Sequence, residues 1–401
     1  MSAELTLLAA DGSLSSAALN EAPGFSKPEG GLRSRVAFAA AHVTPIAWAD
    51  NTPGQPAEID WDATLGFRRA VYSWGLGVAD AMDTAQRNMG LDAAAVRELI
   101  ARSAEVAREE GGSVAVGVNT DHIDDEIISI EQIIDGYKSQ LHHAEEHGAI
   151  PVFMASRHLA RVAESADDYR RVYRAVLAAA TTPVVLHWLG TAFDPQLEGY
   201  FGSTDWREAS QVVVDIIGED PSKVSGIKMS LLDAAAEVSV RERLPEGVRM
   251  YTGDDYNYVG LIGGADVPQA EQPERAADTD RTHSDALLGA FAAITPVASA
   301  AIQALDAGDA GRYYELLAPT EALSRQVFAA PTFYYKTGVA FLAWLNGHQT
   351  AFQMVGGLHS ARSLPHLSRI VELANAAHAL EDPALAAQRW HDHLRLNGVD
   401  A

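Results

Sequence analysis

Lysine is rare in this chain of 401 residues, and one of its five lysines has neighbours that suit covalent chemistry. Lys228 lies between Ile227 and Met229, near the end of a short apolar run. Apolar neighbours deprive an ammonium group of water and favour its neutral form. A neutral amine attacks ketones and aldehydes to form a Schiff base. We therefore expect Lys228 to be a catalytic nucleophile.

A histidine and several polar side chains follow other apolar runs of the chain. His187 lies between Leu186 and Trp188, and an imidazole can move protons near neutral pH. We expect His187 to be the catalytic acid and base that serves Lys228. The expected substrate-binding residues are Asp83, Thr84, Asn119, Asp121, Arg157 and Asp254.

A metal site is the alternative use of the same polar residues. His187 with Asp121, His122 or Asp254 would offer imidazole and carboxylate ligands, which suit zinc, manganese or iron. These residues are spaced as in loops and not as an i, i+4 pair on a helix. Carboxylates in loops can also serve to cap turns. The chain has no cysteine, which excludes thiolate metal sites and a catalytic thiol. We expect no cofactor and keep a divalent metal as the alternative.

The elements that must position these residues alternate between short apolar runs and helical patterns. Buried parallel strands have unbroken apolar sequences, and alternation of strands with helices indicates a parallel sheet. Eight such units over about 250 residues favour a (β/α)8 TIM barrel of the α/β class, and no G-x-G-x-x-G motif supports a Rossmann fold. The expected strands are Val36–Ala41, Leu76–Ala81, Ser113–Val118, Pro151–Met154, Pro183–His187, Ser225–Ile227, Val248–Tyr251 and Ala286–Ala292.

We expect three parts in the chain. Residues 1–32 form an N-terminal hairpin or extension with a turn at Asp11-Gly12, residues 33–308 form the barrel, and residues 309–401 form a C-terminal helical region. Active sites of such barrels lie at the carboxyl ends of the strands. The candidate residues should therefore gather at one mouth of the barrel.

Charge and composition limit the partners of the chain. It has 30 lysines and arginines against 54 aspartates and glutamates, a formal net charge of −24. So acidic a surface repels nucleic acid and anionic lipid, and no run of about 18 uncharged apolar residues could span a membrane. The first residues lack the pattern of a secretory signal. We expect a cytoplasmic protein whose partner is a small carbonyl compound.

Segments on several expected strands share the pattern of a known superfamily. They are Thr44-Pro45, Val114–Asn119, Gly226–Lys228, Asp233 and Tyr251–Asp255. These segments resemble the dihydrodipicolinate synthase / N-acetylneuraminate lyase superfamily, in which the corresponding lysine forms a Schiff base with an α-keto acid. The resemblance implies a barrel with a C-terminal helical region that assembles as a homo-oligomer, either a dimer or a tetramer.

Three further segments are similar to a divergent branch of this superfamily to which no reaction is assigned. They are Ala81–Gln86, Gly190 and Phe333–Gly338. We expect the aromatic part of the last segment to pack against the barrel or against a second subunit. We expect Lys336, at the end of that aromatic part, to lie outside the chemistry.

The chain departs from the superfamily at two positions. The superfamily's Gly-Thr-Thr-Gly-Glu segment, which holds the substrate carboxylate, is replaced by Met82–Gln86, so that Asp83 puts a negative charge there. Like charges in contact cost several kcal/mol at low dielectric constant, which argues against pyruvate as the substrate. The superfamily's proton-shuttling tyrosine is replaced by His187.

These observations predict a Schiff-base-forming lyase or aldolase of carbohydrate metabolism. Its substrate would be a small carbonyl compound, a keto sugar or polyol-like molecule rather than plain pyruvate. Asp83 and Thr84 would hold it near the carbonyl, and Asp121 and Asp254 would bind its hydroxyl groups. The alternatives are a divalent-metal-dependent sugar isomerase or epimerase and a non-catalytic sugar-binding barrel.

Overall fold

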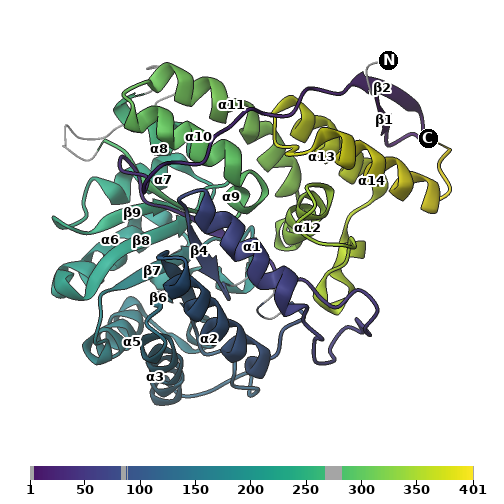
Figure 1. Ribbon diagram of the computed structural model, residues 1–401. Coiled ribbons are helices and arrows are strands. Elements are labelled where there is room, and N and C mark those ends of the chain that lie inside the picture. The colour runs from purple at the N-terminus through teal and green to yellow at the C-terminus, as the bar shows by residue number, and fades with distance from the viewer. Residues whose placement is uncertain (1–3, 83–86, 88, 267–281, 401) are drawn as a thin grey trace.

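The structure is a computed structural model that describes residues 4–82, 87, 89–266 and 282–400. Eight parallel strands form a closed barrel in chain order, and the last strand pairs with the first to complete the ring (Figure 1). The expected (β/α)8 barrel is confirmed. Its strands are β3 (Ala37–Ala40), β4 (Gly77–Asp80), β5 (Val114–Val118), β6 (Ile150–Phe153), β7 (Val184–Leu189), β8 (Val224–Ser230), β9 (Arg249–Thr252) and β10 (Asp285–Leu288).

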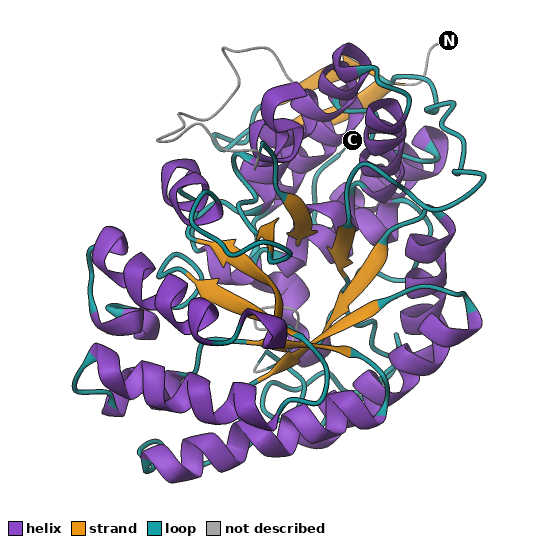
Figure 2. Ribbon diagram, turned by 90° about the vertical axis from the view of Figure 1, so that its left-hand side faces the viewer, coloured by secondary structure: helices purple, strands orange, loops and turns teal. Residues whose placement is uncertain are grey.

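Helices surround the barrel, as Figure 2 shows. Several begin at a residue whose side chain accepts a hydrogen bond from the first turn, as at Asp60, Asp92 and Ser129. The helices around the barrel are α1 (Trp61–Ser73), α2 (Ala93–Glu109), α3 (Ile130–Glu146), α4 (Arg157–Val162), α5 (Ala166–Ala179), α6 (Trp206–Glu219), α7 (Ala234–Arg241), α8 (Tyr258–Gly263), α9 (Ala290–Ala293) and α10 (Thr295–Asp306).

The eighth strand is shorter than the sequence predicts. β10 ends at Leu288, and residues expected to continue it begin the short helix α9 instead. The backbone N–H of Ala290 donates to the carboxylate of Asp255, 2.8 Å away, rather than to a neighbouring strand. The side chain of Asp255, in the loop after β9, therefore accepts a hydrogen bond that a neighbouring strand would accept if β10 continued.

Inward-facing side chains form a small core inside the barrel. Its members include Phe38, Ala40, Ala79, Ala115, Val152, Val185, Tyr251 and Leu287. The three alanines lie on β3, β4 and β5, and their small size leaves room for longer side chains from the opposite wall. That wall is formed by β7 and β8.

The expected N-terminal hairpin and C-terminal helices are present, and they pack on each other. The hairpin joins β1 (Glu4–Leu8) to β2 (Leu14–Ala18), and it lies beside α13 and α14 (Figure 1). The N–H of Leu8 donates to Ser368 Oγ, 2.7 Å away. The C-terminal helices are α11 (Ala310–Val327), α12 (Lys336–Leu345), α13 (Leu364–Ala376) and α14 (Pro383–Leu396).

Trp390 of α14 connects the hairpin to α12. Its indole N–H donates to the carbonyl oxygen of Thr6 at 2.7 Å, and its side chain is fully buried. Its ring meets the ring of Phe341 edge-on, with 5.9 Å between the centroids. Because Phe341 belongs to α12, the first strand of the chain and this helix share one buried contact.

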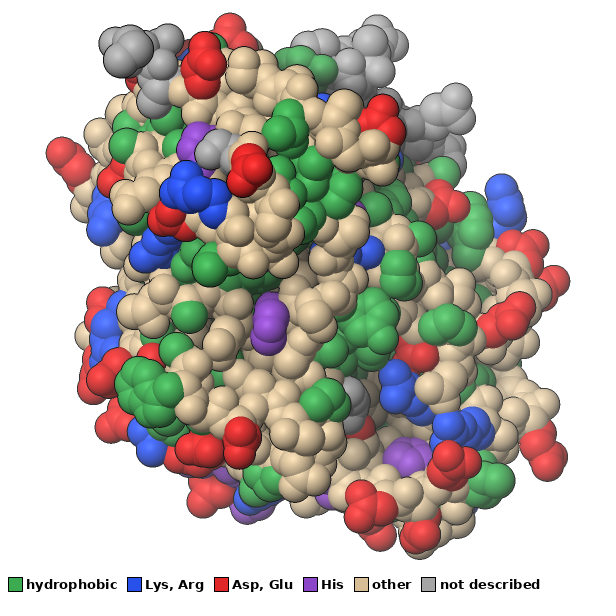
Figure 3. Space-filling view, turned by 90° about the vertical axis from the view of Figure 1, so that its right-hand side faces the viewer, with side chains coloured by type: hydrophobic (Ala, Val, Ile, Leu, Met, Phe, Trp, Pro, Cys, Tyr) green, Lys and Arg blue, Asp and Glu red, His purple; other side chains and the backbone are tan. Residues whose placement is uncertain are grey.

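The surface carries charged side chains of both signs. On the face shown in Figure 3, acidic and basic side chains are interspersed. Among the helices in the described part of the chain, none is long and apolar enough to cross a membrane.

A buried ion pair joins the outer face of the barrel to its first helix. Arg68 of α1 and Asp80 of β4 are both fully buried, and two N–H groups of Arg68 donate to the two carboxylate oxygens at 3.0 and 2.8 Å. Arg68 also donates to the carbonyl oxygens of His42 and Thr64, and Ser103 of α2 donates to Asp80. The pair therefore fixes α1, α2, β4 and the loop after β3 relative to one another.

Replacing Asp80 should destabilise the fold, because Arg68 would keep a buried charge without a counter-ion. We expect Asp80→Ala to lower the free energy of unfolding by about 3–5 kcal/mol, measured by chemical denaturation. The matched control is Glu372→Ala, which removes the partner of Arg369 in an exposed pair and should cost less than about 0.5 kcal/mol. Equal losses for the two variants would contradict a structural role of the buried pair.

Candidate active site

The structure brings Lys228 and His187 together inside the barrel. The two residues are direct partners in the register of β7 and β8, and Lys228 is also paired with Tyr251 of β9. Lys228 is 7% exposed and His187 is fully buried. Both lie close to the carboxyl ends of their strands, where barrels of this kind carry their active sites.

His187 is held as a neutral imidazole. Its Nε2 lies 3.1 Å from the hydroxyl oxygen of Ser230, two residues beyond Lys228 on the same strand. Burial, together with the positive charge of Lys228, holds the pKa of His187 well below its ordinary value. The imidazole can exchange a proton with the Ser230 hydroxyl, but the imidazolium form is disfavoured near neutral pH.

Gly253, directly after β9, provides the space that Lys228 occupies. A Cβ atom on Gly253 would lie 2.2 Å from Ser230 Oγ and 2.8 Å from Lys228 Cε. The Cβ would also lie 2.7 Å from the backbone carbonyl oxygen of Met229, which cannot turn aside as the two side chains can, so this position favours glycine. The backbone N–H of Gly253 donates to the carbonyl oxygen of Met229 at 2.7 Å, which fixes the two strand ends together.

Asp254 and Asp255 follow Gly253 and have different surroundings. The carboxylate of Asp254 accepts hydrogen bonds from the backbone N–H groups of Tyr256 and Asn257 and from the Asn257 side chain, so it stabilises a turn before α8. Burial raises the pKa of Asp254 above its ordinary value. The role in binding substrate hydroxyl groups that we expect for Asp254 stays a prediction.

Asp255 is a site residue that the sequence analysis did not select. Burial raises the pKa of Asp255 to about 7, and the positive charges of Lys228 and Lys336 oppose that rise. Its side chain is 4% exposed and accepts one hydrogen bond, from the N–H of Ala290. Its position beside Asp254 in the segment that resembles the superfamily was the available signal.

Lys336 lies inside the structure, and the expectation that it lies outside the chemistry stays a prediction. It is 1% exposed, its Nζ donates to the carbonyl oxygen of Ala40 at the end of β3, and Nζ lies 5.0 Å from the ring centroid of Tyr335. Burial lowers the pKa of Lys336 to about 7; the charge of Asp255 opposes this shift and that of Lys228 adds to it. A second buried amine therefore shares the barrel mouth with Lys228.

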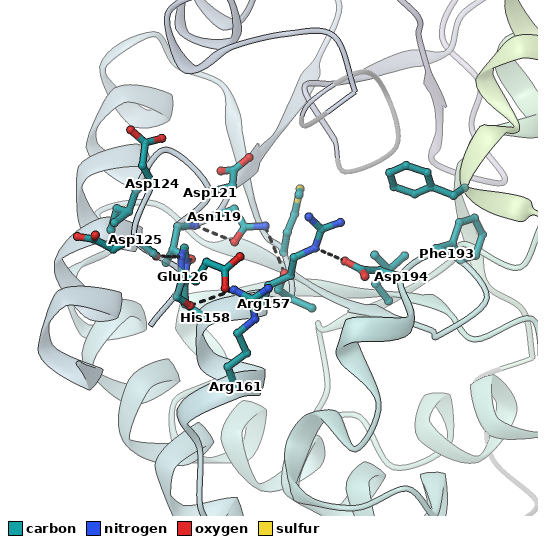
Figure 4. A pocket seen from close by; sticks show the side chains of 16 residues that line it. Asn119, Asp121, Asp124, Asp125, Glu126, Arg157, His158, Arg161, Phe193 and Asp194 are labelled. Atoms are coloured by element: carbon teal, nitrogen blue, oxygen red, sulfur yellow. Dashed lines mark hydrogen bonds and ion pairs between the residues drawn. The ribbon is translucent and has the colours of Figure 1, made fainter. Parts of the chain in front are cut away.

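A pocket of about 180 Å³ opens over the carboxyl ends of β5, β6 and β7. Figure 4 shows its polar side, where several carboxylates and arginines surround the opening. Its lining includes three of the predicted substrate-binding residues, Asn119, Asp121 and Arg157, and it does not include Lys228 or Asp254 among the described residues. Met154 belongs both to this pocket and to the core inside the barrel. The pocket therefore reaches the inner wall of the barrel.

Three polar residues of the pocket already have hydrogen-bond or ion-pair partners within the protein. Arg157 Nε donates to Asp194 at 2.5 Å (Figure 4). Asp121 forms an ion pair with the buried Arg87, with 2.7 Å between Nε and Oδ2. Asn119 donates to the carbonyl oxygen of Ala155 at 3.2 Å. A ligand would meet these three side chains already paired within the protein.

Asp83 and Thr84, the two residues expected to contact the substrate near its carbonyl, lie outside the described residues. The expectation that Asp83 excludes a substrate carboxylate therefore stays a prediction.

The ligands of the alternative metal site are not grouped in the structure. His187 bonds to Ser230, Asp121 pairs with Arg87, and His122 Nδ1 lies 2.7 Å from the amide nitrogen of Gln140. Among the described residues, one group brings the atoms of three possible ligands within 4.8 Å of one another. It lies at the end of α3, in the outer ring of helices, and consists of His143, Glu146 and His147. A metal at the barrel mouth therefore has no preformed ligand set in the described part.

The fold resembles those of several solved structures. The dihydrodipicolinate synthase from Bacteroides thetaiotaomicron matches with a TM-score of 0.61 and 15% identity over 85% of this chain and 98% of that chain. That from Oceanobacillus iheyensis matches with a TM-score of 0.59 and 12% identity over 86% and 96%. KD(P)GA from T. tenax matches with a TM-score of 0.57 and 17% identity, over 85% of this chain and 98% of that chain. The expected likeness to this superfamily is confirmed at the level of fold.

The sequence itself matches one protein family over nearly its whole length. Residues 5–399 match the family described as "Protein of unknown function (DUF993)", and the chain belongs to that family. No curated protein matches the chain.

Adding a methyl group at Gly253 should disturb Lys228 directly. We expect Gly253→Ala to lower the free energy of unfolding by about 1–3 kcal/mol, because the new Cβ overlaps Ser230 and Lys228. The control is Gly66→Ala within α1, where a Cβ meets nothing within 4 Å and which should be neutral or stabilising. If Gly253→Ala were as stable as the control, the close packing around Lys228 would be refuted.

Proposed function

We propose that this protein is a Schiff-base-forming lyase or aldolase that acts on a small carbonyl compound. The observation that carries the proposal is the position of Lys228. It is buried inside a closed barrel, near the carboxyl end of β8, beside a histidine that can exchange protons with a neighbouring hydroxyl. The likeness in fold to dihydrodipicolinate synthases supports the same class of reaction.

The chemistry begins with attack of the neutral Lys228 amine on the substrate carbonyl. The resulting carbinolamine loses its oxygen as water, which requires a proton at the oxygen and loss of one from nitrogen. His187 and the Ser230 hydroxyl are 3.1 Å apart and can move these protons. The iminium that forms withdraws electrons from the adjacent bond, so a C–C bond can break or form without a redox cofactor.

The neutral form of an amine is favoured by the charge of the second buried amine at the barrel mouth. Lys336 is buried close enough to Lys228 for the two charges to affect each other. Two ammonium groups in a poorly hydrated space repel each other, so one of them tends to lose its proton. This arrangement gives the barrel a nucleophilic amine near neutral pH.

The proposed substrate is a keto sugar or a polyol-like carbonyl compound. Asp83 would oppose a substrate carboxylate close to the reacting carbonyl, as the sequence predicts. The pocket over β5–β7 supports this class, since carboxylates such as Asp124 and Asp125 at its rim accept hydrogen bonds from hydroxyl groups. Assembly into a homo-oligomer and a cytoplasmic location remain predictions.

Borohydride trapping tests the proposal. Reduction in the presence of hydroxyacetone, dihydroxyacetone or pyruvate should add a stable adduct at Lys228, identified by intact mass and peptide mapping. Larger yields with the two neutral ketones would agree with the proposed substrate class. Treatment with EDTA should not change the yield, because the step needs no metal.

Two variants make the trapping result specific. Lys228→Met should abolish the adduct, because its side chain has no amine. Lys138→Met, which removes an exposed lysine of α3, should leave the adduct unchanged. Adducts spread over exposed lysines, or none on Lys228, would argue for the sugar-binding or metal-dependent alternatives.

A further inference from the structure

Lys336 is a buried amine to which the proposed reaction so far assigns only an electrostatic effect on Lys228. We propose that Lys336 is the base that removes a proton from the substrate carbon next to the iminium formed on Lys228. This inference rests on the proposed function, because it needs that iminium. It assigns a catalytic residue to the C-terminal helical region, which thereby completes the active site of the barrel.

The segment before Lys336 is fixed to the barrel by aromatic contacts. The ring of Tyr335 stacks on that of Phe328, with 4.2 Å between centroids and 15° between planes. It also packs against the end of β10 so closely that a Cβ on Gly289 would lie 2.7 Å from its Cε2 atom. Phe193, after β7, meets the Tyr335 ring edge-on at 6.2 Å. Lys336 therefore starts α12 from a fixed position over the strand ends.

Lys336 lies at the barrel mouth beside β3, across from β8, which carries Lys228. Its Nζ donates to the carbonyl oxygen of Ala40, whose side chain belongs to the core inside the barrel. Its charge interacts with those of Lys228 on β8 and Asp255 after β9. These three elements, β3, β8 and β9, converge at the same end of the barrel. A small molecule bound covalently to Lys228 would lie within this cluster of groups.

The other charged groups around Lys336 are largely balanced. Arg68 and Asp80 also influence it, but they neutralise each other in a buried ion pair. His42, after β3, has a pKa lowered to about 3, chiefly by burial, so it is uncharged near neutral pH. The protonation of Lys336 therefore depends mainly on its own burial, on Asp255 and on Lys228.

The protonation behaviour of Lys336 suits a base that takes up and returns a proton. Burial lowers its pKa to about 7, so amine and ammonium forms coexist near neutral pH. General acid–base catalysis is most efficient when the pKa of the group lies near the working pH. His187 is less suited to this step, because burial and the charge of Lys228 disfavour its protonated form.

The proton transfer balances without another reactant. The neutral Nζ of Lys336 takes the proton from the carbon beside the iminium carbon. The electron pair of that C–H bond forms a C=C bond, and the pair of the C=N bond moves onto the Lys228 nitrogen. The products are the ammonium of Lys336 and a neutral enamine on Lys228. Reversal returns the proton, and in D₂O it returns a deuteron.

Deuterium exchange measured alongside trapping tests this role of Lys336. With hydroxyacetone in D₂O, the wild-type protein should catalyse exchange of the protons next to the carbonyl, followed by NMR. The rate should rise as the pH increases through about 7, because the amine form of Lys336 is the base. Lys336→Met and Lys336→Arg should each slow exchange by about 100-fold or more while the borohydride adduct on Lys228 persists.

The arginine variant separates catalysis from electrostatics. It keeps a positive charge beside Lys228 but cannot act as a base near neutral pH. If the Lys336→Arg variant exchanged deuterium at the wild-type rate, the inference would be overturned. An adduct trapped on Lys336 itself would overturn it as well. No adduct on Lys228 in the wild-type protein would instead overturn the proposed function.

A second variant tests the same role without replacing the lysine. Asp255→Asn removes the negative charge that raises the pKa of Lys336. The pH profile of exchange should therefore shift to lower pH, while the asparagine oxygen can still accept the hydrogen bond from Ala290. An unchanged profile would contradict Lys336 as the titrating base. Lys138→Met, on the exposed side of α3, serves as the control in all these measurements.

Discussion

Removal of water from amino groups is the physical constraint on which the candidate site depends. Lys228 and Lys336 are 7% and 1% exposed, and burial disfavours the charged form of each. The surrounding structure must hold both amines in place although their burial opposes folding. Small residues make this possible: Ala40 and Ala79 line one wall of the barrel, and Gly253 leaves space beside Lys228. The same desolvation that costs stability makes an amine reactive.

The barrel and its first amine could be predicted because their signals are local. Most of the parallel strands are short, largely apolar runs, so they could be located from the hydrophobic pattern of the sequence. Lys228 and His187 interrupt two such runs, and side chains at the carboxyl ends of barrel strands face the mouth. The order of the strands places β7 beside β8, and the register that pairs the two residues comes from the structure.

The remaining parts of the site depend on contacts between distant segments. Lys336 is amphipathic and follows aromatic residues, a pattern that also fits a surface helix; only the packing of Tyr335 on Gly289 places it over the barrel. Asp121 seemed available to a ligand until its pairing with the buried Arg87 was known. The contact of the hairpin with α13 and α14 likewise joins residues separated by most of the chain.

The hairpin and the second amine belong to one mechanical unit. Thr6 accepts a hydrogen bond from Trp390, Trp390 meets Phe341, and Phe341 lies on the helix that begins with Lys336. A strand formed by the first residues thus braces the helix that carries a reactive group into the barrel. A fragment cut to the eight strands and their helices would hold Lys228 but not Lys336, so the barrel by itself lacks one of the two buried amines.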